Sequence, residues 1–131
     1  MEMTRERLEA YKSEKQEIEE LRYKLNHIKA EDYTGNDVIM DYNTGFPRPQ
    51  SVVGTDINAY WRRKDHLQAE ISRLERRCQE TEQWISQITD SLTRRIFRMY
   101  FEEGKNQKSI AKILHMDQSN ISKKIDKYLS I

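Results

Sequence analysis

A row of small polar and basic side chains near the C-terminal end of the sequence has the types and spacing to do chemistry. On a helix, Ile121 and Ile125 would take the buried side, so the others are not needed for a core. Amides and hydroxyls pair with base edges, and lysines neutralise phosphates, so this row is suited to duplex DNA. The candidates for base contacts are Gln118, Ser119, Asn120 and Ser122, and those for phosphate contacts are Lys123, Lys127, Lys112 and Arg95.

Three short helices are expected to position this row. Asp90 or Ser91 is a suitable N-cap for the first helix, because a short side-chain oxygen can accept a bond from the first turn. The turn after it contains Gly104 at a position typical of a helix C-cap. The second and third helices are expected at 107–114 and 118–129, joined by a turn at 115–117 in which Asp117 is a candidate N-cap.

The apolar residues of this segment predict that the last two helices pack closely across the turn. Ala111 is small enough to allow a close crossing, and Met116 is expected to fill the turn. The inward-facing positions are Ile110, Leu114, Ile121 and Ile125. Two helices joined by such a short turn, with a polar outer side on the second, form a helix-turn-helix.

Charge is distributed unevenly along the chain, although the whole sequence has a net charge of only +1. Residues 1–30 are neutral and residues 31–90 have a net charge of −4. Residues 91–131 hold 9 basic and 4 acidic groups, a net charge of +5. An anionic partner is therefore expected to bind the C-terminal third.

The pattern Ile110-Ala111-x-x-Leu114-x-Met116-x-x-Ser119-x-Ile121-x-x-Lys124-Ile125 is similar to the helix-turn-helix of bacterial sigma-factor region four. In that pattern a basic and then an aliphatic residue follow the buried branched residue, as Lys124 and Ile125 do here. The chain departs from it at His115, where the turn usually has glycine. The resemblance covers about 40 residues and implies DNA binding.

The order of segments resembles that of the phage- and prophage-encoded RinA/ArpU-like transcriptional regulators of Gram-positive bacteria. The shared features are an N-terminal helix, a Gly/Pro interruption and a coiled-coil helix, followed by residues 95–101 and the helix-turn-helix. This resemblance implies control of phage or prophage transcription, with RNA polymerase as a further candidate partner. It does not indicate the operator or the sign of regulation.

The first ninety residues predict two long helices. One is expected over residues 4 to about 30, and the other over 56–89, with Thr55-Asp56 as its N-cap. Between them, residues 32–55 hold both prolines and three of the four glycines, and are expected to form a partly ordered loop in which residues 38–40 and 52–53 pack. The second helix has an apolar stripe with alternating steps of three and four, typical of a coiled coil. Its positions are Ile57, Tyr60, Lys64, Leu67, Ile71, Leu74, Cys78, Thr81, Ile85, Ile88 and Leu92.

This stripe needs a partner. The first helix folded back as an antiparallel hairpin is favoured, and the same helix of a second chain is the alternative. Two helix-turn-helix units would bind a repeated site better than one through effective concentration, so a homo-oligomer is expected.

Several classes of function are not expected. A slender helical chain offers little concave interior for catalysis. A single cysteine and three scattered histidines do not predict a disulfide, a metal site or a cofactor. No apolar run approaches the length of a membrane span, and no signal peptide is visible, so a cytoplasmic protein is expected.

The sequence therefore predicts an all-α protein with a helical hairpin or coiled coil at residues 1–89 and a DNA-binding helix-turn-helix at residues 90–131. The favoured function is sequence-specific binding of double-stranded DNA to control transcription. A phage DNA-packaging or recombination accessory protein is one alternative. A coiled-coil scaffold or adaptor that does not bind DNA is the other.

Overall fold

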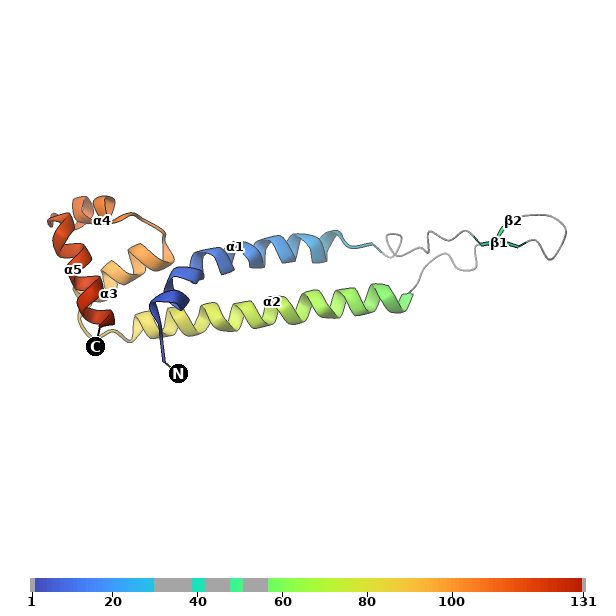
Figure 1. The fold of residues 1–131 in the computed structure, drawn as a ribbon, viewed down its shortest axis with the longest axis horizontal. Coiled ribbons are helices and arrows are strands. Elements are labelled where there is room, and N and C mark those ends of the chain that lie inside the picture. The colour runs from blue at the N-terminus through green and yellow to red at the C-terminus, as the bar shows by residue number, and fades with distance from the viewer. Residues whose placement is uncertain (1, 30–38, 42–47, 51–56, 131) are drawn as a thin grey trace. The chain divides into compact units, whose positions relative to one another are not determined.

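Helices make up most of the part of the chain that the computed structural model describes, which is residues 2–29, 39–41, 48–50 and 57–130 (Figure 1). The predicted helical class is confirmed. In chain order the elements are α1 (Arg5–His27), β1 (Ile39–Asp41), β2 (Arg48–Gln50), α2 (Ile57–Ser86), α3 (Ser91–Phe97), the π-helix η2 (Arg98–Glu102), α4 (Gln107–Leu114) and α5 (Gln118–Leu129).

The two short strands were not predicted. They pair antiparallel, with Ile39 opposite Gln50 and Asp41 opposite Arg48. Both belong to the segment 32–55, which was expected to be a loop with some order. The packing expected of Val38 and of residues 52–53, and the N-cap expected at residues 55–56, lie outside the described residues.

The chain divides into two compact units, and α1 and α2 each contribute to both. One unit combines Met1–Glu19 with Arg73–Ile131, and the other is Glu20–Ser72. The predicted division between residues 1–89 and 90–131 stays a prediction. The first unit, however, has a core to which both sides of that boundary contribute.

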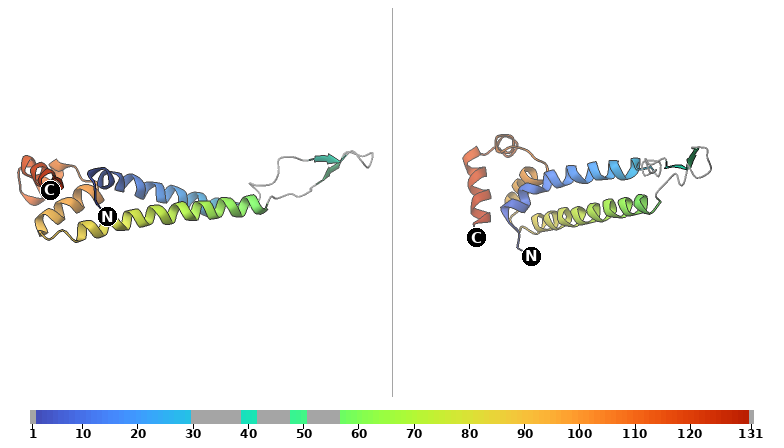
Figure 2. Two further views of the ribbon diagram at one scale, coloured as in Figure 1. Left: turned by 60° about the horizontal axis from the view of Figure 1, so that its bottom comes forward. Right: turned by 45° about the vertical axis from the view of Figure 1, so that its right-hand side comes forward.

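This core of the first unit contains apolar side chains from six helical elements, which are α1, α2, α3, η2, α4 and α5. Leu8 of α1 and Ile85 of α2 are fully buried, together with Phe97 of α3. They belong to one cluster with Ile88, Ile96, Phe101, Ile110, Ala111, Ile121 and Ile125. Trp84 packs beside them, with its ring centroid 5.9 Å from that of Phe97 and 5.7 Å from that of Tyr128. In both views of Figure 2, α3 lies close to the first turns of α1.

Polar contacts join α1 to α2 within the same unit. Arg7 Nη2 lies 2.8 Å from Glu80 Oε2, and Arg77 Nε lies 3.0 Å from Glu14 Oε1. Later residues of α1 thus contact earlier residues of α2, which indicates an antiparallel arrangement of these two segments. Leu74, Cys78 and Thr81 of the predicted stripe are buried here.

The second unit continues the same stripe with less complete burial. Leu21 of α1 and Leu67 and Ile71 of α2 are buried. At the start of α2, by contrast, Ile57 is 51% exposed and Trp61 is 52% exposed. The stripe is therefore buried from Leu67 to Ile88, half-buried at Leu92 and exposed at Ile57.

The helix ends differ from the predicted ones by a few residues. α1 begins at Arg5, because the Thr4 hydroxyl accepts a hydrogen bond from the Arg7 amide at 3.2 Å. α2 ends at Ser86, which corrects the expected end at residue 89. Leu92, the last predicted stripe position, therefore belongs to α3.

The predicted N-cap of α3 is confirmed at Asp90. Its carboxylate accepts hydrogen bonds from the Thr93 amide at 3.0 Å and from the Thr93 hydroxyl at 2.6 Å. These bonds favour the charged form and lower the pKa of Asp90. α3 then continues into η2, where the Glu103 amide donates to the Arg98 carbonyl at 3.0 Å, a spacing of five residues that no sequence pattern predicted.

None of the described helices combines the length and the apolar character that a helix needs to cross a bilayer.

His115 stands where the turn of the similar pattern usually has glycine, and its backbone adopts a conformation that favours glycine. Its φ of 54° and ψ of 48° place it in the left-handed region, where a side chain costs about 1 kcal/mol. It follows α4 and closes the turn through its amide, which donates to the carbonyls of Ala111 and Lys112.

We expect His115→Gly to raise the free energy of unfolding by about 1 kcal/mol, because glycine adopts this conformation without a Cβ clash. Thermal unfolding followed by circular dichroism measures the shift, which should be about 4 °C for a unit of this size. His115→Ala is the control, since alanine keeps the Cβ. An equal gain in His115→Ala would mean that the imidazole, and not the backbone, is the source of the strain.

Candidate nucleic-acid interface

α5 has one buried side and one side open to solvent. Ile121 and Ile125 are 0% exposed, which anchors the helix in the core of the first unit. The predicted site residues on the other side are solvent-exposed: Gln118, Ser119, Asn120, Lys123 and Lys127. Ser122 is only half-buried and lies at the margin of this surface. We call the outward side of α5, formed by these six residues, the polar face.

α4 and the turn after it determine how α5 is held. Ala111 is 7% exposed and Ile110 is fully buried, so the inner side of α4 packs in the same cluster as Ile121. At its beginning, Asn106 Oδ1 accepts a hydrogen bond from the Ser109 amide at 2.8 Å. Met116 packs against the core, as predicted for the turn. α4 and α5 have the bounds predicted from the sequence.

Asp117 occupies the N-cap position of α5 but does not use its side chain as predicted. Its backbone is extended, with φ −73° and ψ 141°, and its side chain forms no capping hydrogen bond. Its carbonyl accepts from the Asn120 amide at 3.0 Å and from the Ile121 amide at 3.3 Å. The beginning of α5 therefore depends on backbone bonds.

The basic residues before α5 differ in whether their side chains form hydrogen bonds or ion pairs. Arg94 Nη1 donates to the Ile88 carbonyl at 2.8 Å, and Arg98 Nε lies 3.8 Å from Glu102 Oε2. Arg95 and Lys112 are exposed. Neither of these two forms an ion pair with another described residue, so both remain available to an anion.

One charged contact at the polar face was missed by sequence reasoning. Arg5 Nη1 of α1 lies 2.8 Å from Asp126 Oδ1 of α5. The two residues are 121 positions apart, so no local pattern could have predicted the pair.

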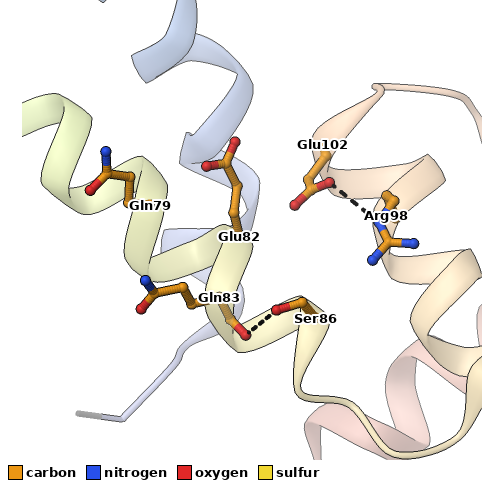
Figure 3. Close-up of a pocket in the computed structure, with 6 residues that line it drawn as sticks. All are labelled: Gln79, Glu82, Gln83, Ser86, Arg98 and Glu102. Carbon is orange, nitrogen blue, oxygen red and sulfur yellow. Dashed lines mark hydrogen bonds and ion pairs between the residues drawn. The ribbon is translucent and has the colours of Figure 1, made fainter.

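A polar groove of about 400 Å³ lies between α2 and the segment α3–η2. Figure 3 shows the carboxylates of Glu82 and Glu102 on its two walls. The remaining lining residues are Gln79, Gln83, Ser86 and Arg98. Ser86 donates to the Gln83 carbonyl at 2.9 Å, and the described lining includes no histidine that could activate its hydroxyl. We assign the groove no catalytic role.

The two glutamates of this groove are in different settings. Glu82 Oε1 accepts a hydrogen bond from the Tyr11 hydroxyl at 2.5 Å and lies 3.5 Å from Lys15 Nζ. Burial, and then this bond to Glu82, raise the pKa of Tyr11. Burial raises the pKa of Glu102 as well, and the neighbouring charge of Glu82 adds to the effect.

Among the described residues, no group of three or more histidine, cysteine, aspartate or glutamate side chains could hold a metal ion. Cys78 is buried on the stripe, and this burial raises the pKa of its thiol.

No family model matches the chain, and no curated protein or solved structure matches it either.

We expect Glu102→Gln to stabilise the protein at pH 7. Because the folded state raises the pKa of Glu102, the folded state favours its neutral form, and stability falls as pH rises through the folded pKa. Glutamine at position 102 cannot ionise, so the variant avoids this loss of stability. Its melting temperature should therefore exceed that of the unmodified chain by about 2 °C at pH 7. The difference should shrink as pH falls and the glutamate becomes protonated.

Melting curves at a series of pH values between about 3.5 and 8 measure this effect, over the range in which a glutamate with a raised pKa titrates. Glu17→Gln, at an exposed position of α1, controls for the loss of one negative charge. A Glu102→Gln variant that is less stable than the unmodified chain at pH 7 would contradict the prediction.

Proposed function

We propose that this protein binds double-stranded DNA through the polar face of α5 and controls transcription. The observation that carries the proposal is the contrast on α5. Two isoleucines are fully buried, while the amide, hydroxyl and ammonium groups of the polar face are open. A helix held by one side in a rigid core can present the other to a major groove.

The chemistry of the polar face suits both kinds of contact with DNA. Asn120 has the amide geometry that pairs with adenine in the major groove, and Gln118 and Ser119 offer further hydrogen bonds to base edges. Lys123 and Lys127 supply charge for phosphates, together with Lys112 on α4 and Arg95 on α3. The net charge of +5 on residues 91–131 supports the same partner, because phosphate neutralisation provides much of the affinity for DNA.

We propose further that α4, the turn at 115–117 and α5 form a helix-turn-helix. The left-handed His115 and the buried Ala111 support this, since the motif needs a tight turn and a close helix crossing. Control of phage or prophage genes, and contact with RNA polymerase, are proposed from the sequence resemblance alone.

We also propose that α1 and α2 form a helical hairpin within one chain. The contacts Arg7–Glu80 and Glu14–Arg77 support it, as does the burial of Leu21 and Leu67. A second copy of the chain can still associate with this hairpin and bring two polar faces to a repeated operator.

Selection of bound duplexes from a random pool, followed by titration of the selected duplex in rising salt, tests the proposed function. DNA binding through several phosphates should weaken steeply as salt rises. A scaffold or adaptor would retain no duplex at any salt, and this result would overturn the proposal. A packaging accessory protein would retain duplexes without enriching one sequence.

We expect Asn120→Ala to bind DNA with relaxed sequence preference, and to lose about 1–3 kcal/mol of discrimination at one base position. Repeating the selection with this variant measures the change. Asn26→Ala, at an exposed amide on α1, is the matched control. An unchanged selected sequence in Asn120→Ala would show that the reading side has been misplaced.

We expect Lys123→Ala to weaken binding to all duplexes about equally, and to lower the slope of log affinity against log salt by about 1. Fluorescence anisotropy at four or five salt concentrations gives the slope. Lys24→Ala on α1 is the matched control and should keep the slope of the unmodified chain. Loss of affinity with an unchanged slope would argue against a phosphate contact at Lys123.

We expect Leu74→Asp to destabilise the hairpin by about 3 kcal/mol, because it buries a charge where an apolar side chain packs. Melting followed by circular dichroism, together with sedimentation, measures the effect. Ala69→Asp, at an exposed position of α2, controls for the added charge. If melting of the unmodified chain depended on its concentration and Leu74→Asp only separated dimers, the stripe would join two chains instead.

A further inference from the structure

Asp126 is the acidic residue of α5, and it lies beside the polar face. Asp126 follows Lys123 by three residues and Ser122 by four, so it lies on the same side of α5 as both. Its side chain is 59% exposed. Beside a phosphate backbone, a carboxylate at this place would oppose binding by like-charge repulsion. The Asp126 carboxylate would also be close enough to form an ion pair with the Lys123 ammonium group.

The partner that Asp126 has in the structure is Arg5. Arg5 Nη1 lies 2.8 Å from Asp126 Oδ1, while its Nε lies 3.1 Å from Glu9 Oε1 on the next turn of α1. The guanidinium group is thus held by one carboxylate of its own helix and one carboxylate of α5. Among the described residues, Lys123 and Lys127 form no ion pair, so the carboxylate leaves both lysines available.

The position of Arg5 follows from the core. Leu8, three residues later on α1, is fully buried in the cluster that contains Ile121 and Ile125 of α5. The first turn of α1 is therefore anchored to the same apolar core as the polar face. An exposed ion pair contributes little to folding, so the main effect of this one is on the charge of the surface.

We infer that Arg5 is a positioning residue for DNA binding: it neutralises Asp126 and so keeps Lys123 available to a phosphate. This inference rests on the proposed function. It makes the N-terminal helix part of the DNA-binding surface, although α1 is separated from α5 by about ninety residues of sequence. Arg5 acts here through Asp126 and not by touching the nucleic acid.

A double-mutant cycle tests this inference on the full chain with the selected duplex. We expect Arg5→Ala to weaken binding about fivefold at low salt, because it leaves the carboxylate uncompensated, and the loss should shrink as salt screens the charge. Asp126→Asn alone should bind at least as tightly as the unmodified chain. Arg5→Ala combined with Asp126→Asn should restore affinity to within about twofold of the unmodified chain.

Two controls separate this role from a structural one. Melting temperatures of the three variants should stay within about 2 °C of the unmodified chain, since the pair is exposed. Arg62→Ala, at an exposed position of α2, should leave affinity unchanged. A large fall in the melting temperature of Arg5→Ala would assign Arg5 to folding and overturn the inference.

The affinities and salt slopes of the variants also distinguish failure of the inference about Arg5 from failure of the proposed function. If the double variant stays as weak as Arg5→Ala, with a salt slope lower by about 1, then Arg5 contacts phosphate directly and the indirect role is wrong. If the unmodified chain binds a duplex and the Arg5 and Asp126 variants bind it equally well, the inference alone fails. If the unmodified chain retains no duplex at any salt, the proposed function and the inference fail together.

Discussion

Burial of one apolar cluster is the constraint on which the first unit depends. Phe97 of α3 meets Leu8 of α1, Ile85 of α2 and Ile121 of α5 in this cluster, and no one of these helices could bury its apolar side alone. Short helices such as α4, with its eight residues, are marginal in water without such packing. The position of the polar face is therefore set by residues from both ends of the chain.

The same cluster explains why the outward side of α5 can be so polar. Ile121 and Ile125 anchor the helix together with the partly buried Tyr128 and Leu129, which leaves the outward positions free of any packing requirement. Hydrophilic side chains on that side cost little in folding, because they stay hydrated. Lys123 and Lys127 place part of the positive charge of the C-terminal third there, where a polyanion could approach without displacing protein contacts.

Local patterns predicted the helices well because local physics decides them. The four-residue spacing of Ile121 and Ile125 and the N-cap oxygen of Asp90 mark α5 and the start of α3, whereas the N-cap at Asn106 was not predicted. Gly104, with a φ of 72°, ends the preceding segment where predicted. The candidate residues of the polar face were placed correctly on the exposed side, apart from the half-buried Ser122.

Non-local features could not be predicted in the same way. The pair Arg5–Asp126 depends on how α1 meets α5, which no periodicity encodes. The π-helix η2 needs one extra residue in a turn, and its sequence is compatible with an ordinary α-helix. α2 ends at Ser86 and a new helix begins at Ser91 with Asp90 as its N-cap, while the stripe by itself would have run on to Leu92.

The interleaved make-up of the first unit has a consequence for how the chain acquires its structure. Leu8 and Ile125 are more than a hundred positions apart in the sequence, yet both occupy one cluster. Contacts between such distant parts of a chain close slowly, since a long loop must be ordered before they form. The apolar side of α1 is therefore fully covered only once the distant residues of α5 have joined the cluster, and a fragment that begins at residue 90 would expose the surface that Leu8, Ile85 and Ile88 normally cover.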